Sequence, residues 1–83
     1  MLHQETRRIL ESLLNKRRIG GKHTEEKNCL RKIKNLSPEE KSIVLKEWKW
    51  CINQELILRL PKTGEWHVSL NPRKLKEVYE IIK

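Results

Sequence analysis

The sequence predicts a mainly α-helical domain with a small β-hairpin, and two observations carry this prediction. Residues 37–54 join a helix-start signal to apolar residues spaced three and four apart, as one face of a helix requires. Residues 56–60 are rich in branched side chains and residues 66–70 alternate, with Pro and Gly between them, which is typical of two strands joined by a tight loop. The whole chain, 1–83, is expected to form one domain around one modest core.

The composition favours an anionic partner. Nineteen Lys and Arg residues oppose eleven acidic residues, all Glu, which gives a net charge of +8. In so small a domain this balance suggests nucleic acid, although a merely solvated surface rich in Lys and Glu is the alternative. No apolar run approaches the ~20 residues of a membrane span, and the first residues do not resemble a signal peptide. Cys29 and Cys51 fall on apolar helical faces, so we expect buried free thiols in a cytoplasmic protein without membrane contact.

The first helix is predicted over residues 2–18. Its apolar stripe is Ile9, Leu10, Leu13 and Leu14, with Thr6 and Arg17 at the edges. The basic run Lys16-Arg17-Arg18 suits the negative end of a helix dipole, and the same side chains could equally contact phosphate. Gly20 and Gly21 then break the helix, and Ile19 could pair as a very short strand.

The second helix is expected from Thr24, as its N-cap, to about Asn35. Its inner face consists of Cys29, Leu30, Ile33 and the following Leu36, and its outer side carries Lys27, Arg31, Lys32 and Lys34. Only Asn35 and Leu36 separate this helix from the next helix start, so the two helices must turn sharply on each other.

The central helix is predicted over residues 37–54. Ser37 is its N-cap, Pro38 fits the first helical position, and Glu40 completes a capping box. The predicted buried stripe consists of Val44, Leu45, Trp48, Cys51 and Ile52, and the opposite face of Ser42, Lys46, Lys49 and Asn53, with Ile43 and Trp50 on its shoulder. Residues 37–55 have a net charge of −1, whereas residues 1–23 carry +4, so the positive charge is concentrated outside this helix.

The hairpin should have its loop at residues 61–65. Strand alternation places Trp66, Val68 and Leu70 on the inward face, with His67 and Ser69 opposite, so Trp66 is expected to seal the hairpin onto the helices. Asn71 and Pro72 are expected to cap and start the last helix, whose inward stripe is Leu75, Val78, Tyr79 and Ile82. Trp48 is expected in the core, whereas Trp50 should be partly exposed and pack against the first or last helix.

This order of elements resembles the winged helix-turn-helix domain. The resemblance is carried by the helix Thr24–Leu36, the turn at Ser37, the helix 37–54 and the hairpin LILRLPKTGEWHVSL as the wing. It implies a DNA-binding, transcription-regulator-like module that places its third helix in the major groove of double-stranded DNA. The candidate nucleic-acid-binding residues are Ser42, Lys46, Lys49 and Asn53 on the helix, Lys62 on the wing, and the basic Arg17, Arg18 and Lys22.

Other functions find weaker support in the sequence. We expect no enzyme and no cofactor, because no carboxylate pair or spaced nucleophile and base is recognisable. A metal site of His23, Cys29 and Cys51 would lack a closely spaced ligand pair, and Gly20-Gly21-Lys22 lacks the spacing of a phosphate-binding loop. The alternative that stays open is a winged helix that binds protein, as a homodimer or with another partner, through the Ile43 and Trp50 shoulder.

Overall fold

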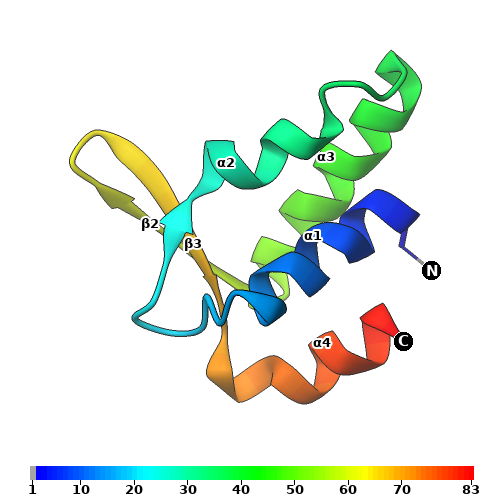
Figure 1. Cartoon of the computed structure of the whole chain (residues 1–83). Helices are drawn as coiled ribbons and strands as arrows, with labels where there is room; N and C mark the ends of the chain where they lie inside the picture. Colours follow the sequence, from blue (N-terminus) through cyan, green and yellow to red (C-terminus); the bar gives the residue numbers. More distant parts are fainter. Residues whose placement is uncertain (1) are drawn as a thin grey trace.

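The computed structural model describes residues 2–83 and shows a mainly helical domain with a small antiparallel sheet (Figure 1). Its elements in chain order are α1 (Gln4–Asn15), β1 (Thr24–Glu25), α2 (Glu26–Leu30), the 3₁₀ turn η1 (Arg31–Ile33), α3 (Pro38–Asn53), β2 (Ile57–Lys62), β3 (Glu65–Leu70), the 3₁₀ turn η2 (Pro72–Lys74) and α4 (Leu75–Ile82). The predicted fold class is therefore confirmed at this level, and the order of elements is compatible with a winged-helix layout.

The sheet has the strand order β1-β3-β2, and its hairpin is longer than the sequence predicts. Ile57 pairs with Leu70 at one end and Lys62 with Glu65 at the other, so the loop is only Thr63 and Gly64 rather than residues 61–65. Both loop residues have positive φ, 48° and 80°, which matches the twist of a two-residue hairpin turn. Pro61 lies within β2, which is an edge strand and can therefore accept a residue without an amide donor.

The start of the second helix differs from the prediction. Thr24 is not its N-cap but pairs with Val68 in the short strand β1, and Glu25 pairs with His67. The α-helix begins at Glu26, ends at Leu30 and continues only as η1, so it does not reach Asn35 as one helix. Strand pairing satisfies backbone groups at Thr24 that a helix would have left free.

The segment before β1 also joins the sheet. Ile19 forms a single parallel bridge with Leu70, which confirms the very short pairing predicted at this residue. The first helix stops at Asn15, and Arg17 has a positive φ of 56°, so Arg17 is not an edge of the helical stripe. Leu14 is only half-buried.

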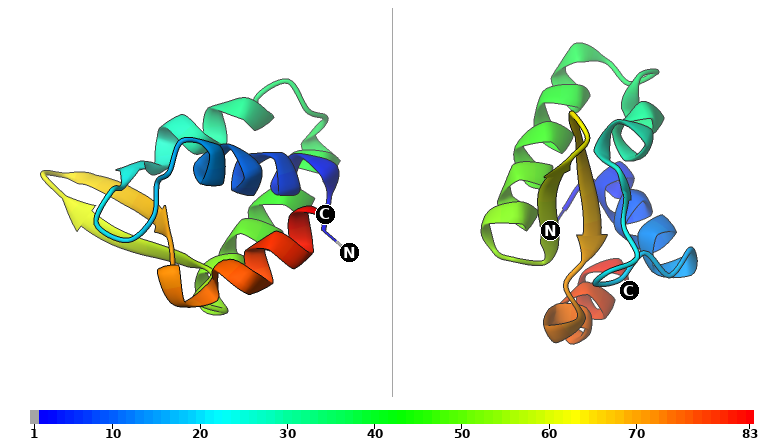
Figure 2. Two further views of the ribbon diagram at one scale, coloured as in Figure 1. Left: turned by 60° about the horizontal axis from the view of Figure 1, so that its bottom comes forward. Right: turned by 90° about the vertical axis from the view of Figure 1, so that its left-hand side faces the viewer.

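The core lies where α1, α3, α4 and the sheet meet. Ile9, Leu10 and Leu13 of α1 pack in one cluster with buried side chains of α3, the sheet and α4. These side chains are Val44, Trp48, Cys51, Ile57, Val68, Leu70 and Val78. The hairpin projects beyond these helices (Figure 2). No helix within residues 2–83 combines the length and the apolar composition needed to cross a bilayer.

The start of α3 confirms the predicted cap. The Ser37 Oγ accepts a hydrogen bond from the Glu40 amide at 3.2 Å, and Pro38 occupies the first turn. The predicted buried stripe is too wide, however. Val44, Trp48 and Cys51 are buried and Ile52 is half-buried, whereas Leu45 is 46% exposed because no other element covers that side of the helix.

Two aromatic side chains also lie outside the core, contrary to prediction. Trp66 is 46% exposed because it belongs to the part of the hairpin that extends beyond the helices, and the Arg59 guanidinium lies 3.8 Å from its ring centre. Tyr79 is half-exposed because α4 packs mainly through Val78. On the face predicted to be polar, Ser69 is fully buried and donates a hydrogen bond to the Gly20 carbonyl at 2.8 Å. Asn71 caps the 3₁₀ turn η2 through the Arg73 amide, and the last α-helix begins at Leu75 rather than at Pro72 as predicted.

Candidate nucleic-acid interface

The outer face of α3 presents the four residues that the sequence singles out. Ser42, Lys46, Lys49 and Asn53 are all exposed. Ser42, Lys46 and Lys49 line one shallow depression of about 500 Å³, which Pro38, Lys41 and the exposed Leu45 complete. We call this surface, Pro38 to Asn53 on the side of these residues, the outer face. The depression on it brings three lysines and Ser42 together without a lining carboxylate, and Asn53 follows on the same side of the helix.

The charges of α3 are sorted between its two sides. The Glu47 carboxylate accepts hydrogen bonds from the His3 amide at 2.8 Å and from the Thr6 hydroxyl at 2.6 Å. The Glu40 carboxylate lies 3.2 Å from the His3 ring, and this hydrogen bond lowers the pKa of Glu40. Both of these carboxylates therefore face α1, whereas Glu39, in the first turn of α3, is exposed. The outer face is positive even though the segment 37–55 carries a net charge of −1.

A single carboxylate joins α2, α3 and the hairpin. Glu26 accepts a hydrogen bond from the Trp48 indole N–H at 2.8 Å and two from the Arg59 guanidinium at 2.9 and 3.0 Å. Burial raises the pKa of Glu26, but the hydrogen bonds from Arg59 and Trp48 outweigh it and leave this pKa below its usual value. The contact fixes the hairpin relative to α3. The sequence could not reveal it, because its three residues lie 22 and 33 positions apart.

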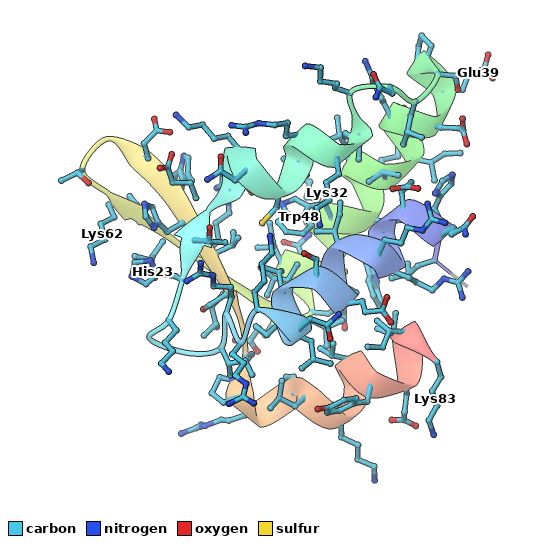
Figure 3. The ribbon with its side chains drawn as sticks, in the orientation of Figure 1. His23, Lys32, Glu39, Trp48, Lys62 and Lys83 are labelled. Carbon is cyan, nitrogen blue, oxygen red and sulfur yellow. The ribbon has the colours of Figure 1, made fainter. Side chains whose placement is uncertain are left out.

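The hairpin carries little free positive charge. Arg59 is neutralised by Glu26, and Glu65 forms an ion pair of 2.9 Å with Lys27 of α2. Lys62 lies 3.4 Å from the His23 ring rather than beside a carboxylate, and Figure 3 shows both side chains at the hairpin. Lys62 is thus the one cation of β2 and β3 that has no carboxylate partner among residues 2–83.

The basic residues that follow α1 do not join the outer face of α3. Arg17 and Lys22 are exposed and Arg18 is half-buried in the segment between α1 and β1. This segment and α3 lie on opposite sides of the sheet (Figure 2, right). Arg18 instead lines a cavity between α1 and α2. The predicted site residues therefore form two separate groups, and one nucleic-acid surface cannot use both without bending around the domain.

The shoulder of α3 is apolar and half-exposed. Ile43 is 46% and Trp50 45% exposed. Trp50 borders a depression of about 400 Å³ with Leu2 and Ile81, so it packs only partly, near the end of α4. The same depression is also lined by Arg7, Glu80 and Lys83.

The thiols are buried and unpaired, as predicted, and Cys51 is deeply buried behind α3. Burial, together with the nearby Glu47, raises the pKa of Cys51 to about 11, which makes it an unreactive thiol at neutral pH. Within residues 2–83 no three His, Cys or Glu side chains are close enough to hold a metal ion. No protein-family model, curated protein or solved structure matches this chain.

Proposed function

We propose that this chain is a winged-helix nucleic-acid-binding domain that places α3 in the major groove of double-stranded DNA. The observation that supports this proposal is the depression on α3, which Lys41, Lys46 and Lys49 line without a carboxylate while Glu40 and Glu47 contact α1. Glu39 is exposed in the first turn of the same helix. A helix of 16 residues is about 24 Å long, and the major groove, about 12 Å wide, admits an α-helix.

In this arrangement the outer face makes both anchoring and base contacts. Lys46 and Lys49 can donate to phosphate oxygens or to guanine, and Ser42 and Asn53 can exchange hydrogen bonds with base edges. Asn53 lies at the last position of α3, so it contacts the end of the site. Sequence-selective binding of this kind would suit a transcription regulator. The hairpin then adds Lys62 alone, because Arg59 is already bound to Glu26.

The salt dependence of binding tests the proposal. Each phosphate that a lysine neutralises contributes about −0.9 to the slope of log affinity against log salt, so Lys41, Lys46, Lys49 and Lys62 together predict a slope of about −3.6. Fluorescence anisotropy with a labelled duplex at several salt concentrations measures this slope. Absence of binding to any duplex at low salt would contradict the proposal.

A matched pair of double variants locates the interface. Lys46→Ala with Lys49→Ala should weaken binding and make the slope shallower by about 1.8. Lys76→Ala with Lys83→Ala removes the same charge from exposed positions at α4 and should leave the slope unchanged. Neither pair should alter the melting temperature, because these side chains are exposed and form no ion pair with a carboxylate of residues 2–83. An equal loss of affinity from both pairs would show binding by net charge alone.

The second candidate is a protein-interaction domain, and the half-exposed Ile43 and Trp50 favour it. A partner, or a second copy, would then cover this shoulder. Sedimentation of the wild type and of Trp50→Ala distinguishes the two functions. A dimer that dissociates in the variant, combined with no DNA binding, would support the interaction domain.

A further inference from the structure

A cavity of about 380 Å³ lies between α1 and α2, and four cationic side chains line it. Lys16 and Arg18 follow α1, and Arg31 and Lys32 belong to η1. The view of Figure 3 looks onto this side of the molecule, with Lys32 labelled between the two helices. The cavity is thus separate from the outer face of α3, which lies on the other side of the domain.

These cations form no ion pair with a carboxylate among residues 2–83, and the cavity lining includes no Glu. The Arg31 guanidinium donates instead to the Asn28 amide oxygen at 3.0 Å. By contrast, Lys27 on the opposite side of α2 contacts two carboxylates. Four like charges around one cavity repel each other, and a bound anion would reverse that cost.

The remaining lining suits a ligand with a polar and an apolar part. The Ser12 hydroxyl and the Asn28 amide offer further hydrogen bonds, whereas Ile9, Leu13 and Cys29 form an apolar wall. Burial raises the pKa of the Cys29 thiol, and the Glu26 charge acts in the same direction, whereas Lys32, Lys16 and Arg18 act in the opposite direction. These three cations therefore lie near the apolar wall. A volume near 380 Å³ lies in the range of small-molecule sites, about 300–1,000 Å³.

We propose that this cavity is a phosphate-binding site, in which Lys16, Arg18, Arg31 and Lys32 hold a phosphate group. Arg18 and Arg31 match the geometry of phosphate oxygens, and the two lysines act as point charges. The apolar wall provides a place for the remainder of a small phosphorylated molecule. The proposal does not depend on DNA binding by α3.

Titration with inorganic pyrophosphate, followed by amide resonances in NMR, tests the site. Saturable shifts are expected at Ser12, Asn28 and Cys29, and not along the outer face of α3. Lys16→Ala with Lys32→Ala should weaken binding about a hundredfold or more, because each of the two charge-assisted hydrogen bonds contributes about a factor of ten or more. Lys16→Arg with Lys32→Arg should retain binding and shows that the fold tolerates changes at these positions.

The control is Lys46→Ala with Lys49→Ala, which removes equal charge from α3 and should leave pyrophosphate affinity unchanged. Shifts spread over every basic surface, an equal loss in both alanine pairs, or no saturable binding would overturn the proposal.

A short duplex identifies the source of the phosphate. If Lys16→Ala with Lys32→Ala weakens duplex binding and pyrophosphate displaces the duplex, the site takes a phosphate of nucleic acid. If duplex binding is unchanged while pyrophosphate binding is lost, the site takes a small phosphorylated molecule. Failure of the pyrophosphate titration would leave the salt-slope test of α3 unaffected, so the two proposals fail separately.

Discussion

Removal of the Glu26 carboxylate tests whether one side chain holds the hairpin to the helices. Glu26→Ala leaves the buried Trp48 indole N–H without its acceptor, which costs about 1–3 kcal/mol. It also frees the Arg59 guanidinium, whose side chain is 31% exposed, so water recovers most of that interaction and only about 1 kcal/mol is lost. The free energy of unfolding should therefore fall by about 2–4 kcal/mol, which for a domain of this size corresponds to about 10–20 °C in melting temperature.

Two further variants separate the hydrogen bond from the charge. Glu26→Gln keeps an amide oxygen that can accept from Trp48, so it should lose only about half as much as Glu26→Ala. Glu11→Ala removes an exposed carboxylate from α1 and should change stability by less than about 0.5 kcal/mol. Urea unfolding, followed by tryptophan fluorescence and circular dichroism, measures all three. A Glu26→Ala protein as stable as the Glu11→Ala control would refute this role of the carboxylate.

The same contact predicts a dependence on acid pH. The pKa of Glu26 is lower in the folded protein than its usual value of 4.5, so the unfolded chain binds the proton more tightly. The stabilisation is complete above pH 4.5 and is lost as the pH falls through the folded pKa. The stability difference between the wild type and Glu26→Gln should accordingly shrink in acid. A difference that stays constant from pH 7 to pH 3 would exclude the charge as its source.

Three other perturbations test the architecture. Ser37→Ala should lower the free energy of unfolding by about 0.5–2 kcal/mol, measured by urea unfolding, because the Glu40 amide loses its cap. Gly64→Ala should destabilise the hairpin by about 1 kcal/mol in the same assay, because its φ of 80° strains a residue with a Cβ. Partial burial, Lys62 and His67 lower the pKa of His23 below 6.5, so stability should fall as the pH drops below 6.5, and His23→Gln should remove that part of the pH profile.

Local signals explain what the sequence predicted well. Ser37 and Glu40 are three residues apart, and the hairpin joins strands that are adjacent in the chain, although its loop is shorter than predicted. The exposed positions of α3 follow from helical periodicity, so Lys46 and Lys49 could be placed on a free surface without knowledge of any other element.

Long-range contacts explain the errors. Thr24 is a residue type that favours helix caps, but it pairs with Val68, 44 residues later, and so belongs to a strand. Trp66 lies two residues before Val68 and therefore on the same face of the strand, yet the helices that would cover it end before the hairpin does. Leu45 shows the same limit on α3, because periodicity gives the direction of a side chain but not the width of the surface that its neighbours cover.

The charge of a surface is the property that sequence windows describe least well in this protein. The net charge of −1 on residues 37–55 argues against nucleic-acid binding only if acidic and basic side chains share one surface. Glu40 and Glu47 contact α1, which separates them from Lys46 and Lys49. The cavity between α1 and α2 shows the reverse case, since the basic segment of Lys16 and Arg18 and that of Arg31 and Lys32, separate in the sequence, line one space. A domain with lysines on α3 and a second cationic site behind it can hold two anions at once. This separation of charge predicts that the protein binds a duplex and pyrophosphate at the same time. Loss of Lys46 and Lys49 should then not affect pyrophosphate binding, and loss of Lys16 and Lys32 should not affect duplex binding.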